Sequence, residues 1–317
     1  MTRSKKTQAF GSEAQARIGH GEQGRTMDKV IVIVGQTASG KSDLAVMFAK
    51  KWGGEVISAD SRQVYKGLDI GTNKITKKEM RGVPHHLLDI ASPKKRFTVL
   101  EFKNLADKKI KNILSRGKIP VLCGGTGFYI DAVTRGIIMP AVPPNQRLRK
   151  SLEGKTAAEL FSVLKKLDAR RAKIIDKNNR VRLIRAIEIA RALGKVPKIT
   201  ETPPPYKFIK IGLYLPNTEL KQKLHKRTLR MFRQGLLPEI KKLKKAGITE
   251  KRLKELGFEY FHPIPDKVTG DNFKYAKRQM TWFKRDKEIR WFTPKKREEI
   301  FSFLQNAIHR GESTRKR

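Results

Sequence analysis

The residues of this chain with the clearest chemical potential form a short glycine-rich loop. The loop fits the phosphate-binding pattern G-x-x-x-x-G-K-[ST] and consists of Gly35, Gln36, Thr37, Ala38, Ser39, Gly40, Lys41 and Ser42. Glycines let backbone N–H groups surround a phosphate at the start of a helix. Lys41 adds a positive charge, and the hydroxyl of Ser42 can ligate Mg²⁺. The sequence therefore predicts that a phosphate ester binds here.

The segments on either side of the loop are those that such a loop requires. Residues 29–34 are a continuous run of mostly β-branched apolar residues, which predicts a buried parallel strand. Residues 43–50 have the apolar spacing of a helix, and Gly53 and Gly54 follow as a stop signal. Because strand, loop and helix occur in this order, a chance glycine-rich turn is the weaker interpretation.

Further strands alternate with helices along the chain. Apolar runs predict strands at 55–60, 119–123 and 208–215, and a helical pattern covers 99–114. This alternation predicts an α/β fold, with a P-loop core whose parallel sheet is flanked by helices. Ligands of such sheets bind beyond the carboxyl ends of the strands. We therefore expect Asp60 and the glycine turn after the third strand to converge on the loop.

The chain divides into an extension, a core and an insertion. We expect residues 1–28 to be a disordered extension, residues 29–140 and 201–317 to form the α/β catalytic core, and residues 141–200 to form an inserted helical domain. Proline-rich stretches flank the insertion on both sides. Within it, Thr156 and Glu159 form a capping-box signature that predicts a helix ending near residue 167.

Charge indicates the kind of partner. The formal net charge is +41, and residues 141–317 contribute +28 of it, interleaved with apolar residues. That pattern favours a folded surface facing a polyanion, although excess lysine can also be solvated surface. The single cysteine excludes a disulfide framework or a Cys/His zinc cluster. We find no apolar run of membrane-spanning length, and we expect a cytoplasmic monomer without membrane association.

Several collinear blocks of sequence carry a family resemblance. Together they resemble the tRNA dimethylallyltransferases (tRNA isopentenyltransferases) of the bacterial type, over residues 30 to about 292. The blocks are 35–42, 60–65, 67–74, 83–89, 124–129, 182–188, 235–237, 256–258 and 275–283. Two departures are mild, since Gln36 replaces a usual Pro and Phe128 a usual Leu. The zinc finger of the eukaryotic form is absent.

The resemblance implies a reaction. A dimethylallyl group moves from dimethylallyl diphosphate to N6 of the adenosine 3′-adjacent to the anticodon of a tRNA, and diphosphate is released. The loop and Lys41 would stabilise the charge of the leaving group, and Ser42 would hold Mg²⁺. Asp60 would act as the general base. The family pattern also places the Thr126 hydroxyl at the site and Arg227 against the diphosphate.

Two of these roles have alternatives at the level of residue types. A carboxylate after the second strand, such as Asp60, can equally ligate Mg²⁺ in phosphate-loop enzymes, and only the resemblance favours the base. Thr126 can be a simple turn former.

Recognition of tRNA requires that the target base leave the stack of the anticodon loop. Candidate contacts combine charge, hydrogen-bonding groups and one aromatic platform. They are Asp60, Ser61, Arg62, Gln63, Arg147, Arg182, Arg185, Lys277, Arg278, Gln279, Trp282 and Lys284. Each could instead be ordinary surface or core, but their concentration in a basic segment favours RNA contact.

Three other functions share part of these features. A P-loop kinase of small molecules or nucleotides would use the same loop but would not need the excess of positive charge. A prenyltransferase of free AMP would not need the insertion. A non-catalytic RNA-binding protein would not need Lys41, Ser42 and Asp60 together.

Overall fold

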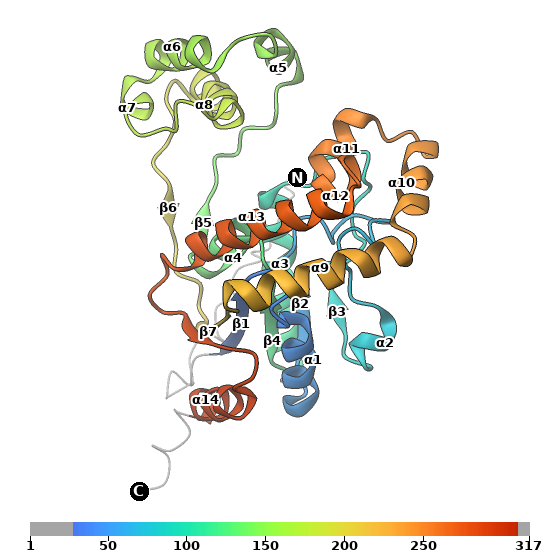
Figure 1. The fold of residues 1–317 in the computed structure, drawn as a ribbon. Helices are drawn as coiled ribbons and strands as arrows, with labels where there is room; N and C mark the ends of the chain where they lie inside the picture. Colours follow the sequence, from blue (N-terminus) through green and yellow to red (C-terminus); the bar gives the residue numbers. More distant parts are fainter. Residues whose placement is uncertain (1–27, 310–317) are drawn as a thin grey trace, which may run out of the picture.

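The computed structural model describes residues 28–309 (Figure 1). The expected extension at residues 1–28 therefore lies, except for its last residue, outside the described residues. No helix between residues 28 and 309 is long and apolar enough to cross a membrane.

A six-stranded sheet forms the centre of the molecule, and every neighbouring pair of its strands is parallel. The order across the sheet is β3-β2-β4-β1-β7-β8. Their bounds are β1 Lys29–Gly35, β2 Glu55–Ser58, β3 His85–His86, β4 Pro120–Cys123, β7 Lys207–Leu213 and β8 Arg290–Phe292. The predicted α/β fold with a parallel sheet is confirmed. All carboxyl ends consequently meet at one edge, where ligands of such sheets bind.

Helices bury both faces of this sheet. Ile31 and Ile33 of β1 belong to the core formed with α1 (Lys41–Trp52) and α14 (Arg297–His309). The alternate residues of β1 join α3 (Val99–Leu114) and α4 (Gly127–Thr134) on the other face. Because both faces are covered, the strand reads as a continuous apolar run rather than as an alternation.

Two long helices lie side by side across the molecule, α9 (Asn217–Arg233) and α13 (Pro265–Phe283) (Figure 1). Leu220 and Leu224 of α9 pack in one small core with Ala276 of α13. Around them lie the shorter helices α2 Lys77–Met80, α10 Leu236–Lys245, α11 Glu250–Leu256 and α12 Phe258–Phe261. A further core joins helices α10 to α12 to the segment after β2.

Four helices project from the rest of the molecule at the end of a two-stranded stalk (Figure 1). The stalk pairs β5 (Ile137–Ile138) antiparallel with β6 (Thr200–Glu201). The helices are α5 Gln146–Leu152, α6 Ala157–Leu167, α7 Ala169–Ala172 and α8 Arg180–Leu193. Their buried apolar residues form a core that contains no residue of the sheet. Thr156 caps α6 with the predicted capping box.

Close approach of β2 and β4 at their carboxyl ends generates a stability prediction. A Cβ on Gly124 would lie 2.2 Å from the carbonyl oxygen of Ala59, which is backbone and cannot move aside. We expect Gly124→Ala to lower the free energy of unfolding by about 1–3 kcal/mol or more. Chemical denaturation followed by circular dichroism measures this loss.

Gly270 is the matched control, because it lies inside α13 and a Cβ there meets nothing within 4 Å. We expect Gly270→Ala to stabilise the protein by up to about 1 kcal/mol. Equal stability of the two variants would contradict the tight packing at Gly124.

Candidate active site

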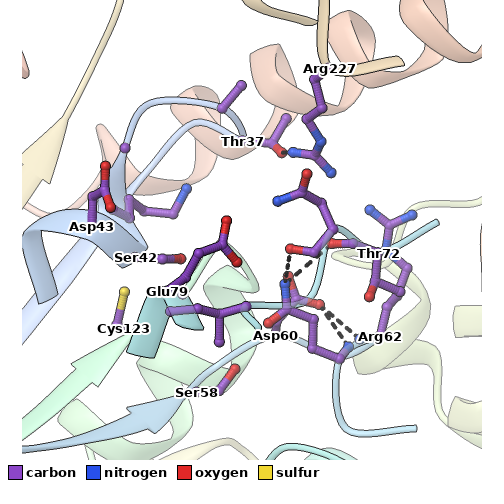
Figure 2. A pocket seen from close by; sticks show the side chains of 18 of the residues that line it. Thr37, Ser42, Asp43, Ser58, Asp60, Arg62, Thr72, Glu79, Cys123 and Arg227 are labelled. Carbon is purple, nitrogen blue, oxygen red and sulfur yellow. Dashed lines mark hydrogen bonds between the residues drawn. The ribbon is translucent and has the colours of Figure 1, made fainter. Parts of the chain in front are cut away.

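A cavity of about 440 Å³ opens at the carboxyl ends of β1, β2 and β4 (Figure 2). The phosphate-binding loop, Asp60 and the turn at 124–125 line it, together with side chains of α9 and α13. The structure thus brings together the loop, Asp60 and Arg227, which are far apart in the sequence.

The loop is held by the protein on both sides. Its backbone turns through left-handed conformations at Gly35, Ala38 and Gly40. Gly35 is required by packing as well, since a Cβ there would lie 2.1 Å from the carbonyl oxygen of Leu213. The N–H of Leu215 donates to Oε1 of Gln36 at 2.8 Å. Gln36, the residue that departs from the family pattern, therefore anchors the loop to the segment after β7.

Two cations lie against the loop without a carboxylate partner. Nζ of Lys41 donates to the carbonyl oxygen of Gln36 at 2.5 Å, and Nη1 of Arg227 donates to Oγ1 of Thr37 at 2.5 Å. Within residues 28–309 neither forms an ion pair, and the buried Nε of Arg227 has no hydrogen-bond partner. Burial lowers the pKa of Lys41 to about 8 and that of Arg227 to about 10. Both charges would be stabilised by an incoming anion.

Three more basic residues of α9 line the same cavity, which sequence reasoning missed. They are Lys223, Lys226 and Arg230. Lys223 lies four residues before Arg227 and Arg230 three after it, while Lys226 lies three residues after Lys223 and four before Arg230. These separations place the four side chains on one side of the helix, and the spacing was the signal available in the sequence.

Asp60 presents one carboxylate oxygen to the cavity. Its Oδ1 accepts hydrogen bonds from the backbone N–H groups of Arg62 at 2.9 Å and Gln63 at 3.3 Å. The second oxygen, Oδ2, forms no hydrogen bond with any part of the chain that the structure describes. The side chain is therefore fixed in direction and still has an acceptor available.

Thr126 lies beside the turn that follows Asp60. Its Oγ1 accepts from the N–H of Ser61 at 2.9 Å and lies 3.2 Å from the Ser61 hydroxyl. Although Thr126 occupies the N-cap position of α4, its side chain does not cap that helix. These contacts fix the segment after Asp60.

Arg62 is engaged inside the protein. Its Nη1 donates to Oε2 of Glu259 at 2.5 Å, and its guanidinium lies 5.3 Å from the rings of both Phe258 and Tyr275. Burial opposes its charge, but Glu259 and Tyr275 raise the pKa of Arg62 above its usual value. The neighbouring Gln63 donates through Nε2 to the carbonyl oxygen of Thr72 at 3.2 Å.

Gln279 is buried and links two loops. Its Oε1 accepts from the N–H of Thr37 at 2.7 Å, and its Nε2 donates to the carbonyl oxygen of Gly125 at 2.9 Å. Three residues on, Nε1 of Trp282 donates to Oδ2 of Asp131 at 3.0 Å. Both side chains, which the sequence assigned to tRNA, thus contact protein.

The remaining predicted tRNA residues divide by exposure. Arg185 is half-buried and donates to the carbonyl oxygen of Val142 at 2.8 Å. Five side chains are exposed, two on the projecting helices and three on or just after α13: Arg147, Arg182, Lys277, Arg278 and Lys284.

A second cavity of about 630 Å³ adjoins the first, with Arg62 and Tyr275 lining both. Aromatic and basic side chains of α11 and α12 contribute to it, among them Phe258, Phe261 and Lys254. Alternating rings and cations are suited to stacking and backbone contacts of single-stranded nucleic acid.

Metal binding by the protein alone is not supported in residues 28–309, where no group of three His, Cys, Asp or Glu could hold an ion. The exposed Ser42 lies in the first cavity, with Asp43 and Glu79 close by (Figure 2). Magnesium commonly binds through few protein ligands together with phosphate oxygens and water. Ser42 fits a Mg²⁺ that arrives with a phosphate ligand.

Comparison with known proteins identifies the family of this chain. The sequence model described as IPP transferase matches residues 63–286, more than half of the chain. The chain belongs to the IPP transferase family. It is therefore a transferase enzyme.

Relatives cover nearly the whole chain of this transferase. A tRNA dimethylallyltransferase of Anoxybacillus flavithermus is 36% identical, covering 89% of this chain and 98% of the relative. One from Halalkalibacterium halodurans is 38% identical with the same coverage.

Solved structures agree in fold. The crystal structure of the full-length tRNA isopentenylpyrophosphate transferase from Bacillus halodurans has a TM-score of 0.65 at 35% identity, covering 90% of this chain and 99% of that one. A eukaryotic dimethylallyltransferase acting on tRNA has a TM-score of 0.65 at 29% identity, covering 81% and 70%.

The lowered pKa of Lys41 generates a pH prediction for the transferase. A bound diphosphate would favour the protonated amine of Lys41. It would therefore raise the pKa of Lys41 above the value of about 8 that this residue has in the protein without ligand. Affinity for an alkyl diphosphate should therefore be constant from about pH 7 to 8, because its terminal phosphate ionises near pH 6. Above pH 8 affinity should fall, approaching tenfold per pH unit. Calorimetric titration at pH 7 to 9.5 measures this.

Lys41→Met is the control. It should bind the diphosphate more weakly, with no fall between pH 8 and 9.5. A wild-type affinity that stays flat to pH 9.5 would show that Lys41 does not titrate against the ligand.

Proposed function

We propose that this protein transfers a dimethylallyl group from dimethylallyl diphosphate to N6 of the adenosine 3′-adjacent to the anticodon in tRNA, and releases diphosphate. The observation that carries the proposal is one cavity in which two cations without carboxylate partners and a carboxylate with a free oxygen face each other. The names of the relatives support tRNA as substrate.

The cationic side of the cavity fits the leaving group. As the bond from C1 to the diphosphate oxygen breaks, negative charge grows on the diphosphate. Lys41, Arg227 and the backbone N–H groups of the loop are preorganised donors for that charge. Ser42 would hold Mg²⁺ against the phosphate oxygens, where the ion would neutralise charge and orient the diphosphate. The loop residues 35–42 thus form the proposed diphosphate site.

Asp60 is the proposed general base. The lone pair of adenine N6 is delocalised into the ring, so the amine needs to lose a proton as the new bond to C1 forms. Asp60 Oδ2 would accept this proton while Oδ1 stays bonded to the backbone. Thr126 holds the segment after Asp60 and is proposed to complete the catalytic group.

The tRNA would contact three regions. We propose that residues 141–200 form the tRNA-binding insertion on the core of residues 29–140 and 201–317, with Arg147, Arg182 and Arg185 facing the RNA backbone. Lys277, Arg278 and Lys284 extend the basic surface along α13, and the second cavity accepts bases next to the target. Ser61 and Gln63 are proposed readers beside Asp60.

Other assignments follow from the substrates. We propose a monomer as the active unit. Its action on tRNA supports the cytoplasm as the compartment. Family membership favours this reaction over a kinase or an AMP prenyltransferase.

The direct test is incubation with dimethylallyl diphosphate, Mg²⁺ and unmodified tRNA, followed by mass analysis of the nucleosides. We expect N6-dimethylallyl-adenosine. Transfer of phosphate from ATP with no prenylated nucleoside would overturn the proposal.

Substitution of Asp60 distinguishes a role as general base from a role in holding the backbone of the next residues. Asp60→Asn keeps an oxygen that can accept from Arg62 and Gln63, whereas Asp60→Ala removes it. If Asp60 is the base, both variants should lose about 10²–10⁴-fold in turnover while tRNA binding is retained. Single-turnover kinetics and a filter-binding assay measure the two quantities.

Two outcomes would contradict this role. Normal turnover in Asp60→Asn would mean that the carboxylate only shapes the backbone. Recovery of that variant at high Mg²⁺ would make Asp60 a metal ligand instead.

Exposed arginines of the projecting helices should bind phosphate groups. Arg147→Ala and Arg182→Ala should each weaken binding of every tRNA substrate alike, because phosphate contacts position the RNA and base contacts specify it. Each should lower the slope of log affinity against log salt by about 0.7–0.9. Salt titration of tRNA affinity measures the slopes.

Lys50→Ala is the matched control, since Lys50 is an exposed cation at the far end of α1. Its slope should equal that of the wild type. Arg147 and Arg182 variants with that same slope would exclude these helices from tRNA binding.

A further inference from the structure

A cluster of exposed lysines lies outside the active-site cavity. Its members come from the loop between β3 and α3, from the end of α10 and from α11, and they are Lys94, Lys95, Lys245 and Lys254. We call these four residues the lysine cluster. No ion pair within residues 28–309 includes any of them. The lysine cluster therefore presents positive charge that these parts of the protein do not neutralise.

The surrounding segments have too few acidic residues to balance this charge. Residues 92–96 and 241–255 carry ten basic and two acidic side chains. Both acids, Glu250 and Glu255, already form ion pairs with basic residues of the same segments. Such an excess of positive charge on a folded surface favours a polyanionic partner.

The loop that carries Lys94 and Lys95 is held in place by α11. Arg252 donates through Nε to the carbonyl oxygen of Pro93 at 2.7 Å and through Nη2 to that of Lys95 at 2.8 Å. These bonds fix the backbone on both sides of Lys94. Just beyond the end of α10, a Cβ on Gly247 would lie 3.9 Å from Nζ of Lys94. The loop, α10 and α11 therefore form one continuous surface.

This surface begins at the rim of the second cavity. Lys254 lines that cavity, and its Nζ lies 5.2 Å from the centre of the Phe261 ring, which lines the cavity as well. Phe97, two residues after Lys95, is a further lining residue. A strand of RNA whose bases enter the second cavity would continue past this rim. Its next phosphate groups would then lie close to the lysine cluster.

We propose that the lysine cluster binds backbone phosphates of the tRNA beside the bases that enter the second cavity. This inference rests on the proposed function, and it adds a fourth contact region to the insertion, α13 and the second cavity. Phosphate contacts position a nucleic acid but carry no sequence information. The lysine cluster should therefore add affinity for every substrate tRNA without selecting among them.

The test is a salt titration of tRNA affinity for the double variant Lys94→Ala with Lys95→Ala, followed by filter binding. Loss of two phosphate contacts should lower the slope of log affinity against log salt by about 1.4–1.8. The ratio of wild-type to variant affinity should therefore shrink by about 7- to 12-fold as salt rises from about 50 to about 200 mM. Binding of dimethylallyl diphosphate should be unchanged, because neither lysine lines the active-site cavity.

Two control variants separate this effect from a change in net charge. Lys94→Arg with Lys95→Arg keeps both charges and should keep the wild-type slope. Lys108→Ala with Lys111→Ala removes two exposed cations of α3 instead. Because α3 ends just before the amino end of β4, these lysines lie toward the edge of the sheet opposite the active-site cavity. Their double variant should also have the wild-type slope.

A Lys94 and Lys95 alanine variant with the wild-type slope would overturn the proposal. An equal fall in the Lys108 and Lys111 variant would overturn it as well, since the effect would then follow net charge alone. The proposed function is tested separately, because these binding measurements do not require turnover. Failure of wild-type protein to prenylate tRNA would refute that function, whereas normal prenylation with an unchanged slope would refute only the role of the lysine cluster.

Discussion

Alignment of the active site depends on one buried carboxamide, that of Gln279. It accepts a hydrogen bond from the phosphate-binding loop and donates one to the turn after β4. A carboxamide carries the acceptor and the donor that these two contacts require on one rigid group. A Cβ on Gly125 would lie 2.2 Å from its Nε2, so the turn is shaped around this side chain. The helix that carries Gln279 thereby fixes the distance between the phosphate-binding loop and the turn at Gly125.

Three cations lie close together around the active-site cavity, and they differ in whether a carboxylate pairs with them. Burying a cation without a partner is unfavourable, yet Lys41 and Arg227 lie together against one loop. Neighbouring Arg62 has a similar environment but is neutralised by Glu259. Arg62, which has a carboxylate partner, therefore supports the wall of the cavity, whereas Lys41 and Arg227 are available to bind an anion. This unfavourable charge would become favourable on binding of the proposed diphosphate.

Local signals explain what the sequence could predict. The capping residues Thr98 and Thr156 begin α3 and α6 where expected, and α3 has the predicted bounds. Strands β3 and β8, of two and three residues, are too short for any periodicity. The internal roles of Arg62 and Gln279 depend on partners 197 and 242 residues away. Residue type alone suggested that both side chains face RNA, because long-range pairing is invisible in a linear pattern.

The stalk of β5 and β6 has a thermodynamic consequence. It joins two hydrophobic cores that share no residue. Apart from the stalk, residues 28–309 show one exposed ion pair between the projecting part and α11, that of Glu153 with Lys251. Such pairs contribute little to stability. The projecting helices and the rest of the molecule should therefore unfold independently of each other. Thermal unfolding followed by calorimetry should then show two transitions. A single free energy of unfolding would average two separate events.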